Sequence, residues 1–489
     1  VQSYSGADDS ETVGQTIRVQ ADAIRLQNST LTAGLAADGS ESHNGRVDLT
    51  GAEVSLSDSR IQVSGELSSE AHSLSLDAPS QIAAEHASLA GISQLINEGQ
   101  IAVKQTLTIA NPQSLTLQGA GTTHAGTLEL QAGTIQNHTQ LIANQLNAEA
   151  ETIDNSGKLV SAGTQTLLVT GQLSNQGAIQ SAGEQSITAG TFHQQSTGVT
   201  TSQTDQQIVA EQIDNAGTLA AGGAQRLSVS GQLTNTGQIQ AVGDQLIEAD
   251  GFAQKGSVSS DANSQLNTGT LINDGDLTSL GDMSISVDTL TLNQAVTANG
   301  DLDVNTTGDM VLNHNLSAGG DARLSAGGKL SNQGKLVAQG QTAVSVGGTF
   351  TNLATGLISG NTTTLNAGVL TNQGTIQALT NLMATLTQFT NQGATLGMQD
   401  TTLNVAGNLT NTGLLYAGDQ GYFYVKGHLI NTEADILTGG KMVIAGDASG
   451  AMATSVQNIS GVIQSGADPG QDHERFLNKI DQFDDQGWL

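Results

Sequence analysis

The sequence predicts an all-β fold, a parallel β-helix whose coils are about 20 residues long. Asparagine recurs at a nearly constant interval, and aliphatic residues two positions apart occupy a fixed place between successive asparagines. Only 2% of the 489 residues are aromatic. A globular core of this length would normally contain more aromatic side chains, because each one buries a large area. The core must therefore be narrow and built from small and branched aliphatic side chains.

Asparagine carries the clearest repeat. Six asparagines in the second half are spaced about 20 residues apart, as are two pairs in the first half. Glycine usually occupies the second position after each asparagine, and aliphatic residues occupy the fourth, twelfth and fourteenth positions. The residues that we predict as structural turn asparagines are Asn155, Asn175, Asn215, Asn235, Asn332, Asn352, Asn372, Asn391, Asn411 and Asn431.

The spacing within each repeat favours strands over helices. Apolar residues two positions apart lie on one face of a strand, and segments broken by Gly and Asn are too short for helices. Gly and Asn also tolerate the positive φ that we expect at the bends. Stacked coils then pair in parallel and in register, with asparagines in ladders, whereas an isolated Asn-x-Gly would favour a hairpin turn. The residues that we expect in the core are Leu167, Val169, Val344, Val346 and Val425.

The repeat changes along the chain. We predict an irregular leader over residues 1–14, longer loop-bearing coils over 15–130 and regular coils over 131–465. Residues 466–489 do not follow the repeat and are expected to be a cap or the start of a following domain. Within them, Asp472–Gln486 fits a short amphipathic helix.

The longer coils are predicted from wider spacing of apolar pairs. A loop rich in Gly, Ser, Asp and His, from Gly34 to Arg46, is expected to project from one corner. The pairs that we place at equivalent positions are Ile17/Val19, Val47/Leu49 and Leu74/Leu76.

Charge and composition exclude several classes of function. The formal net charge is −30, so the chain would repel nucleic acid and anionic lipid. Cysteine is absent, which excludes disulfides and thiolate metal sites. No apolar run is long enough to insert into a membrane. The chain begins at Val1 without a signal peptide, and we expect an interior fragment of a longer protein.

Several repeat units resemble a known family. The segments 171–179, Gly-Gln-Leu-Ser-Asn-Gln-Gly-Ala-Ile, and 348–353, Gly-Thr-Phe-Thr-Asn-Leu, are similar to the haemagglutinin repeats of filamentous haemagglutinin-like exoproteins of bacterial two-partner secretion. That family includes adhesins and the stalks of contact-dependent growth-inhibition toxins. The resemblance covers roughly residues 15–465, but no amino-terminal secretion domain with its Asn-Pro motifs is found; Asn111-Pro112 is a poor match.

The resemblance implies a right-handed parallel β-helix on the surface of a Gram-negative bacterium. About 20 coils at about 4.8 Å each would give an elongated rod of roughly 100 Å. The implied function is that of a secreted structural stalk for adhesion or cell–cell contact, with the toxin stalk as the alternative. The implied partners are a protein or glycan receptor on a host or neighbouring cell, and an outer-membrane secretion partner that acts through the missing amino-terminal domain.

An enzyme is the less favoured interpretation. A β-helix polysaccharide-degrading enzyme needs converging carboxylates and groups that hold a sugar. Here Asp and Glu are scattered, and the closest pairs, Asp301/Asp303 and Asp8/Asp9, are more simply solvated charges. The nine histidines show no metal-ligand spacing. We therefore expect no catalytic residues, cofactor or metal.

One aromatic cluster breaks the repeat. Tyr416, Tyr422 and Tyr424 lie close together in the sequence, and the repeat places Phe423 at an inward position. Tyr422 and Tyr424 should then point outward, and exposed aromatic residues are enriched at recognition sites. We predict the three tyrosines as candidate binding residues. The alternatives are that they pack on a neighbouring loop or cap, or that the loop from Gly34 to Arg46 makes the contact.

Overall fold

The computed structural model describes residues 15–35, 41 and 44–466. The chain divides into two compact units, unit 1 (Val1–Asp250) and unit 2 (Gly251–Leu489). Every regular element in the described residues is a β-strand. Accordingly, this part of the chain contains no helix that could span a membrane.

The strands of unit 1 follow one another with short turns between them. They are β1 (Thr16–Gln20), β2 (Ala23–Gln27), β3 (Thr30–Ala33), β4 (Arg46–Thr50), β5 (Glu53–Ser57), β6 (Arg60–Val63), β7 (Glu66–Glu70), β8 (Ser73–Leu76), β9 (Gln81–Ala84), β10 (His86–Ala90), β11 (Gln94–Asn97), β12 (Gln100–Gln118), β13 (Thr122–Asn137), β14 (Gln140–Asn155), β15 (Lys158–Ser161), β16 (Gln165–Asn175), β17 (Ala178–Ser181), β18 (Gln185–Gln194), β19 (Val199–Ser202), β20 (Gln206–Asn215), β21 (Thr218–Ala221), β22 (Gln225–Asn235) and β23 (Gln238–Ala241). The boundary between the units falls within β24 (Gln245–Gln254).

Unit 2 continues with strands of the same kind. They are β25 (Ser257–Ser260), β26 (Ser264–Asn273), β27 (Asp276–Ser279), β28 (Met283–Leu292), β29 (Val296–Ala298), β30 (Leu302–Thr306), β31 (Met310–Leu312), β32 (Leu316–Ala318), β33 (Ala322–Ala326), β34 (Leu330–Asn332), β35 (Lys335–Ala338), β36 (Gln341–Asn352), β37 (Leu357–Gly360), β38 (Thr362–Asn372), β39 (Thr375–Ala378), β40 (Leu382–Asn391), β41 (Ala394–Gly397), β42 (Thr401–Val405), β43 (Leu409–Asn411), β44 (Leu414–Ala417), β45 (Gly421–Val425), β46 (His428–Thr432), β47 (Asp435–Thr438), β48 (Met442–Ala445), β49 (Ser455–Ile459) and β50 (Val462–Ser465).

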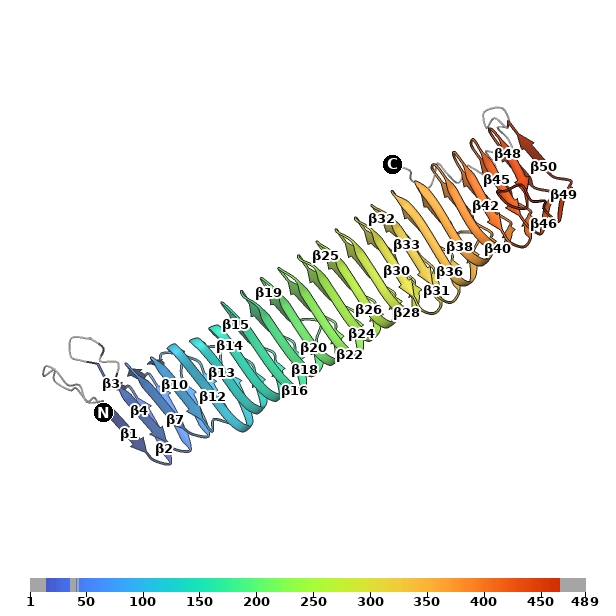
Figure 1. Cartoon of the computed structure of the whole chain (residues 1–489). Coiled ribbons are helices and arrows are strands. Elements are labelled where there is room, and N and C mark those ends of the chain that lie inside the picture. Colours follow the sequence, from blue (N-terminus) through green and yellow to red (C-terminus); the bar gives the residue numbers. More distant parts are fainter. Residues whose placement is uncertain (1–14, 36–40, 42–43, 467–489) are drawn as a thin grey trace. The chain divides into compact units, whose positions relative to one another are not determined.

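A typical coil has three sides, and each side pairs in parallel with the same side of the next coil. Figure 1 shows the strands of successive coils stacked within each unit. In unit 1, β4, β5 and β6 pair with β7, β8 and β9. In unit 2, β30, β31 and β32 pair in the same way with β33, β34 and β35. The predicted fold class, a parallel β-solenoid with coils of about 20 residues and about 20 turns, is confirmed.

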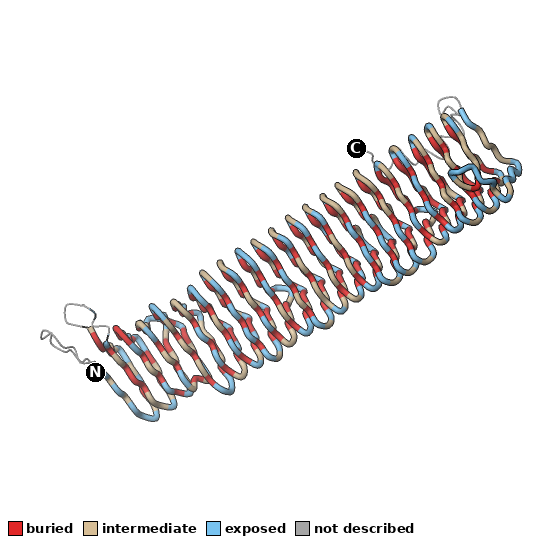
Figure 2. The backbone as a smooth tube through the Cα atoms, viewed as in Figure 1, coloured by how far each residue is buried: buried red, intermediate tan, exposed pale blue. Residues whose placement is uncertain are grey.

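The core of each unit is a stack of buried aliphatic rows contributed by all three sides of the coils. Figure 2 shows buried residues recurring at matching places in successive coils. All five predicted core residues are buried: Leu167, Val169, Val344, Val346 and Val425. The residue between the first two, Leu168, faces outward and is 42% exposed. Because alternate residues of a strand point to opposite faces, the inward rows stay aliphatic while the outward positions vary.

The alignment that we predicted for the early coils was wrong at Leu74 and Leu76. In the structure Leu74 pairs with Val54 of β5, and not with the strand that carries Val47. The strand that pairs with β4 is β7, in which the second inward position is Ser69. A buried serine at this position replaces the second aliphatic residue of the pair. The sequence of β7 therefore lacks the apolar pair by which we aligned the early coils.

The corner glycines have a different role from the one we predicted. None of the ten turn asparagines has a positive φ, and neither does Gly177 nor Gly413. A Cβ on Gly177 would lie 2.0 Å from the carbonyl oxygen of Gly157, and a Cβ on Gly413 would lie 2.0 Å from that of Gly393. Glycine is required at these corners because successive coils approach too closely for a side chain.

The first coil is the longest. The first strand of this coil, β1, pairs with β4, and Thr16 lies opposite Arg46. The coil is long because it includes the predicted loop from Gly34 to Arg46. Residues 36–40 and 42–43 of this loop lie outside the described residues. Glu41 is described, and it accepts hydrogen bonds of 2.8 and 3.1 Å from the Nζ of Lys104. The predicted leader 1–14 and the predicted helix 472–486 also lie outside the described residues.

Candidate functional site

Tyr422 and Tyr424 lie on the outward face of β45 in unit 2. Phe423 between them points into the core and is fully buried. The two tyrosine rings are stacked, with centroids 6.1 Å apart and planes inclined by 25°. Both side chains are half-buried. The predicted inward and outward placement of these three residues is therefore confirmed.

Neighbouring groups hold the ring of Tyr422 in place. The Nζ of Lys441, from the next coil, lies 5.7 Å from the ring centroid, a cation–π distance. The hydroxyl of Tyr422 donates a hydrogen bond to the Oε1 of Gln420. In the preceding coil, Thr402 and Asn404 occupy the positions of the two tyrosines. The pair is thus an ordered aromatic surface set beside smaller polar side chains.

Tyr416, which we predicted as a candidate binding residue together with Tyr422 and Tyr424, does not belong to this surface. It lies in β44, on another side of the coil, and is only 3% exposed. It belongs to a separate apolar cluster with Ala394, Leu396, Leu414 and Leu437. A ring buried in this way is not available to a partner at the surface. Proximity in sequence was misleading because a corner separates β44 from β45.

The ten turn asparagines occupy one position in successive coils and are all buried. Within each run, the Nδ2 of one asparagine donates to the Oδ1 of the asparagine in the next coil, at 2.7 to 2.9 Å. In unit 1, Gln194 interrupts the row between Asn175 and Asn215. Its Nε2 donates to the carbonyl of Thr218 instead, and the Oδ1 of Asn215 has no partner. The ladder is structural, because its amides are buried and join one coil to the next.

A second ladder was missed at the sequence level. Five buried glutamines of unit 1 form a row in which the Nε2 of each later member donates to the Oε1 of the glutamine one coil earlier, at 2.7 to 2.9 Å. They are Gln165, Gln185, Gln206, Gln225 and Gln245. Their spacing of one coil is present in the sequence, but glutamine also occurs at many other positions of the repeat, so the spacing alone does not distinguish this row.

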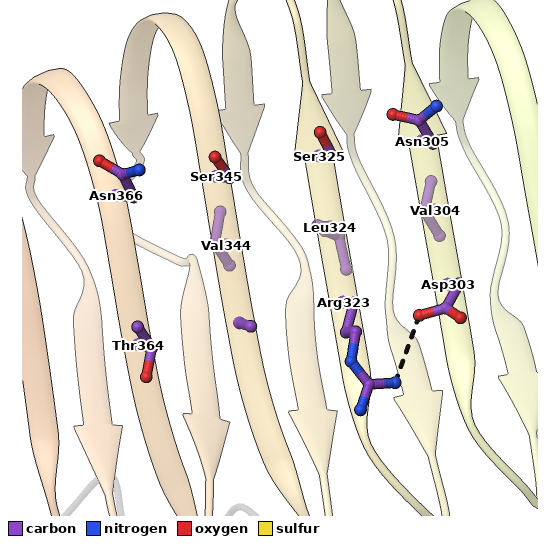
Figure 3. Close-up of a pocket in the computed structure, with 11 residues that line it drawn as sticks. Asp303, Val304, Asn305, Arg323, Leu324, Ser325, Val344, Ser345, Thr364 and Asn366 are labelled. Carbon is purple, nitrogen blue, oxygen red and sulfur yellow. Dashed lines mark ion pairs between the residues drawn. The ribbon is translucent and has the colours of Figure 1, made fainter.

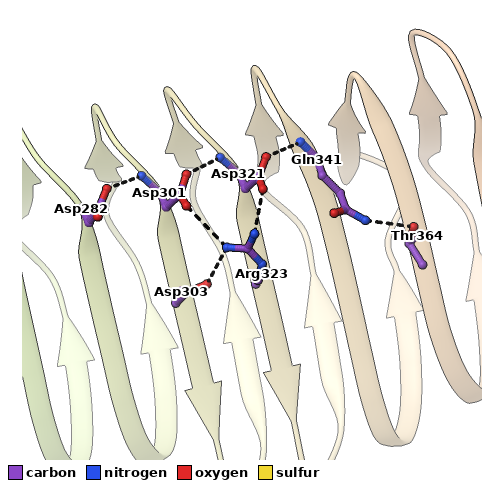
Figure 4. A network of polar contacts seen from close by, with 7 residues as sticks. All are labelled: Asp282, Asp301, Asp303, Asp321, Arg323, Gln341 and Thr364. Atoms are coloured by element: carbon purple, nitrogen blue, oxygen red, sulfur yellow. Dashed lines mark hydrogen bonds and ion pairs between the residues drawn. The ribbon is translucent and has the colours of Figure 1, made fainter.

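An aspartate row runs along one corner of unit 2 (Figure 4). The Oδ1 of each aspartate accepts a hydrogen bond of 2.8 Å from a backbone N–H in the next coil. Asp301 donates to Asp282, Asp321 donates to Asp301, and Gln341 donates to Asp321. Each carboxylate therefore fixes the start of the strand in the following coil. This use of Asp explains why acidic residues recur at the corner.

Arg323 joins this row to Asp303. Its guanidinium lies 2.7 Å from Asp321, 3.5 Å from Asp301 and 3.6 Å from Asp303. Burial lowers the pKa of Arg323, but the charges of Asp303 and Asp321 and the contact with Asp301 raise it above its usual value. A guanidinium between Asp301 and Asp303 is unlike the arrangement of a glycosidase, in which a carboxylic acid and a carboxylate flank the sugar bond.

A shallow groove of about 380 Å³ opens beside Arg323 on the outward face of β30, β33, β36 and β38 (Figure 3). Asn305, Ser325, Ser345 and Asn366 form a row along it, and Arg323 with Asp303 lies at the other edge. The small side chains of Ala343 and Ser345 create the hollow. In the described part of the chain, no three His, Asp or Glu side chains are placed to hold a metal ion.

Comparison with known families decides the identity of the repeat. The haemagglutinin repeat matches residues 160–237, 240–305, 281–334, 332–422 and 426–468, more than half of the chain. The chain belongs to the haemagglutinin-repeat family. These repeats are typical of filamentous haemagglutinin adhesins and are typically non-catalytic. No curated protein and no solved structure matches the chain.

The haemagglutinin-repeat match begins later than the resemblance that we expected from residue 15. Residues 15–159 nevertheless form coils of the same parallel kind, from β1 to β15. The fold of this part therefore rests on its own strand pairing.

Proposed function

We propose that this chain is a solenoid section of a secreted filamentous protein on the surface of a Gram-negative bacterium. It acts as a structural stalk in adhesion or cell–cell contact, and the tyrosine pair Tyr422 and Tyr424 contacts a receptor on the opposing cell. Membership of the haemagglutinin-repeat family supports the secreted, adhesive role. A partner in the outer membrane would export the longer protein.

The observation that carries the proposed contact is the stacked, half-buried pair, which replaces Thr402 and Asn404 of the preceding coil. Tyrosine presents a large area with few rotatable bonds, which is why it is enriched at interfaces and binding hot spots. Stacking and the contact with Lys441 restrain the ring of Tyr422 before a partner arrives, so little freedom remains to be lost on binding.

The experiment compares binding of the purified chain to target cells, measured by flow cytometry over a concentration series. In the test variant Tyr422→Ser is combined with Tyr424→Ser, and in the matched control Thr402→Ser is combined with Asn404→Ser one coil earlier. Both variants should fold, because all four positions face outward. We expect the test variant to bind at least about fivefold more weakly, the effect of losing a true anchor of roughly 1 kcal/mol.

Unchanged binding by the tyrosine variant would exclude the pair as the contact. A variant that lacks the loop from Gly34 to Arg46 then distinguishes the remaining interpretations. Loss of binding in that variant would place the contact at the loop. Full binding by both variants would make this section a spacer.

A further inference from the structure

The corner between β48 and β49 of unit 2 carries an inserted loop. Residues 446–454 join these two strands, whereas residues 426–427 join the equivalent strands β45 and β46 of the preceding coil. In the coil before that, residues 406–408 join β42 and β43. The strand pairing of the solenoid therefore does not need the extra residues. Insertions in repeat proteins lie on the surface and often belong to a binding face.

Hydrogen bonds hold this insertion, called here the 446–454 loop, in one conformation. The Oδ1 of Asp447 accepts from the backbone N–H of Ser449 at 2.9 Å and from that of Ala451 at 3.1 Å. The backbone N–H of Gly446 donates to the carbonyl of Ala451 at 2.6 Å. Gly450 has φ 90°, a left-handed conformation that glycine adopts without strain. A loop fixed in this way loses little conformational freedom when a partner binds it.

The 446–454 loop exposes one large apolar side chain. Met452 is 94% exposed, and the next most exposed large apolar side chain in the described part of the chain, Leu280, is 57% exposed. Methionine is enriched at protein–protein interfaces, and its flexible, polarisable side chain fills irregular apolar pockets. The solenoid gains no core burial from Met452, so this side chain is available to a partner.

The same loop is anchored beside the tyrosine pair. Thr454, at the end of the loop, donates its hydroxyl to the carbonyl of Lys426 at 3.0 Å. Lys426 follows Tyr424 by two residues. The loop begins where β48 ends, and β48 pairs with β45, the strand that carries Tyr422 and Tyr424. Both ends of the loop therefore start from the part of the coil that presents the two tyrosines.

Two lysines flank the tyrosine pair. Lys426 continues the outward row of β45 after Tyr424 and is exposed, and the Nζ of Lys441 lies over the ring of Tyr422 at the other end. Asp447 interacts electrostatically with Lys426, whereas no described carboxylate forms an ion pair with Lys441. The whole chain has a formal net charge of −30, so a cation beside exposed aromatic rings is contrary to its overall charge. A partner with acidic groups would be attracted here and repelled by most of the remaining surface.

We propose that Tyr422, Tyr424, Lys441 and Met452 form one contact surface, called here the tyrosine–methionine surface, and that its partner is a protein with acidic side chains around an apolar pocket. This assignment rests on the proposed receptor contact at Tyr422 and Tyr424 and adds the chemical class of the receptor. Met452 enters the pocket, the two rings pack around it, and Lys441 faces the acidic side chains.

The groups on this surface favour a protein over a glycan. A glycan site needs several polar groups that converge on the sugar hydroxyls. Here the hydroxyl of Tyr422 already donates to Gln420, and the residues of the next coil opposite the tyrosines are Val443 and Ala445. An apolar centre with a charged group at its edge is the usual composition of a protein–protein contact.

The first test determines the chemical class of the receptor. Target cells are treated with trypsin, which digests surface proteins, or with periodate, which oxidises surface glycans. After washing, flow cytometry measures binding of the purified chain. We expect trypsin to reduce binding to the level of the variant that combines Tyr422→Ser with Tyr424→Ser, and we expect periodate to leave binding unchanged.

The second test determines whether the loop and the lysine take part. Met452→Ser should weaken binding at least about fivefold, Met452→Leu should preserve it, and Met383→Ser is the control at another exposed methionine of unit 2. Lys441→Glu should weaken binding at low ionic strength, and the difference should shrink as salt is added. Lys329→Glu makes the same change of charge at an exposed position elsewhere in unit 2 and should bind as the unaltered chain does.

The outcomes separate this assignment from the receptor contact on which it rests. Loss of binding after periodate but not after trypsin, with the tyrosine variant still impaired, would leave the receptor contact in place and overturn the protein class. Full binding by Met452→Ser and Lys441→Glu, again with an impaired tyrosine variant, would overturn the tyrosine–methionine surface. Full binding by the tyrosine variant would overturn both.

Discussion

The Nδ2 of Asn391 donates a hydrogen bond of 2.8 Å to the Oδ1 of Asn411, its counterpart one coil further along the chain. The same nitrogen lies 3.0 Å from the carbonyl oxygen of Leu414, and the Oδ1 of Asn391 accepts from Asn372 at 2.9 Å. One amide thus joins three successive coils inside a narrow core. The amide group is buried, so water cannot replace its partners.

Replacing Asn391 should therefore destabilise unit 2 more than replacing an outward asparagine. Asn391→Ala removes the ladder hydrogen bonds to Asn372 and Asn411, although Asn372 still donates to the carbonyl of Ala394 and Asn411 still accepts from the N–H of Gly413. We expect the loss of these buried hydrogen bonds to cost about 2 kcal/mol. Asn404→Ala, on the outward face of β42, should change stability by less than about 0.5 kcal/mol. Urea denaturation followed by circular dichroism measures both. Equal midpoints for the two variants would contradict a structural role for the ladder.

The aliphatic rows can be tested at Val346, which is 4% exposed and stacks between Ala326 and Ala367. Val346→Asp places a carboxylate in a core without a cation to pair with it, and we expect a loss of at least about 3 kcal/mol. Ser345→Asp puts the same charge on the adjacent outward position and serves as the control. Thermal unfolding should show a lower melting temperature for the first variant only. An unchanged melting temperature for Val346→Asp would mean that the register of β36 is wrong.

Methionine oxidation tests inward and outward placement without mutation. Met452 is 94% exposed, Met383 50% and Met398 46%, whereas Met283 and Met310 are 2% and 0% exposed. Mild hydrogen peroxide should therefore convert the first three to sulfoxides well before the last two. Peptide mass spectrometry over a time course gives the order, and the urea-unfolded chain provides the control in which all five react alike. Early oxidation of Met310 in the folded chain would contradict its inward position.

The sequence predicted those features that depend on local alternation. The inward direction of Phe423 and the outward direction of Tyr422 and Tyr424 follow from a period of two within one strand. The asparagine ladder follows from the coil length, because residues one coil apart stack when coils pair in register. Both inferences need only the distance along the chain.

Features that depend on what lies against a coil could not be predicted in this way. Tyr416 has an outward position by alternation, yet it is buried in an apolar cluster with Leu396, Leu414 and Leu437 of its own and adjacent coils. The pair Leu74/Leu76 was misaligned because a buried Ser69 replaces an aliphatic residue in the preceding strand. Gly177 is required because a side chain there would meet the carbonyl oxygen of Gly157 in the adjacent coil. This distance between coils cannot be inferred from the residues that flank Gly177 in the sequence.

The last prediction concerns pH and the corner formed by Asp77 in unit 1. Its Oδ2 accepts a hydrogen bond of 2.8 Å from the hydroxyl of Ser57, and both carboxylate oxygens lie 3.0 Å from the backbone N of Asp58. Asp58 has φ 45°, a left-handed conformation, and the carboxylate of the following coil holds it. The hydroxyl of Ser80 also donates to Asp77.

These hydrogen bonds lower the pKa of Asp77 below its usual 3.8, and the hydrogen bond from Ser80 has the largest effect. Partial desolvation of the carboxylate opposes this shift. A carboxylate with a lowered pKa in the folded state stabilises that state above its usual pKa. The stabilisation is lost as the pH falls through the lowered value, where the folded chain also binds the proton. Asp77→Asn should therefore lower the melting temperature at pH 7, and the difference from the unaltered chain should shrink as the pH falls below 3.8 and through the lowered pKa of Asp77. Ser80→Ala removes the largest cause of the shift and should show the same pH dependence with a smaller amplitude. Melting curves from pH 7 to pH 2 measure the effect, and a difference that stays constant over this range would assign the role of Asp77 to packing instead of charge.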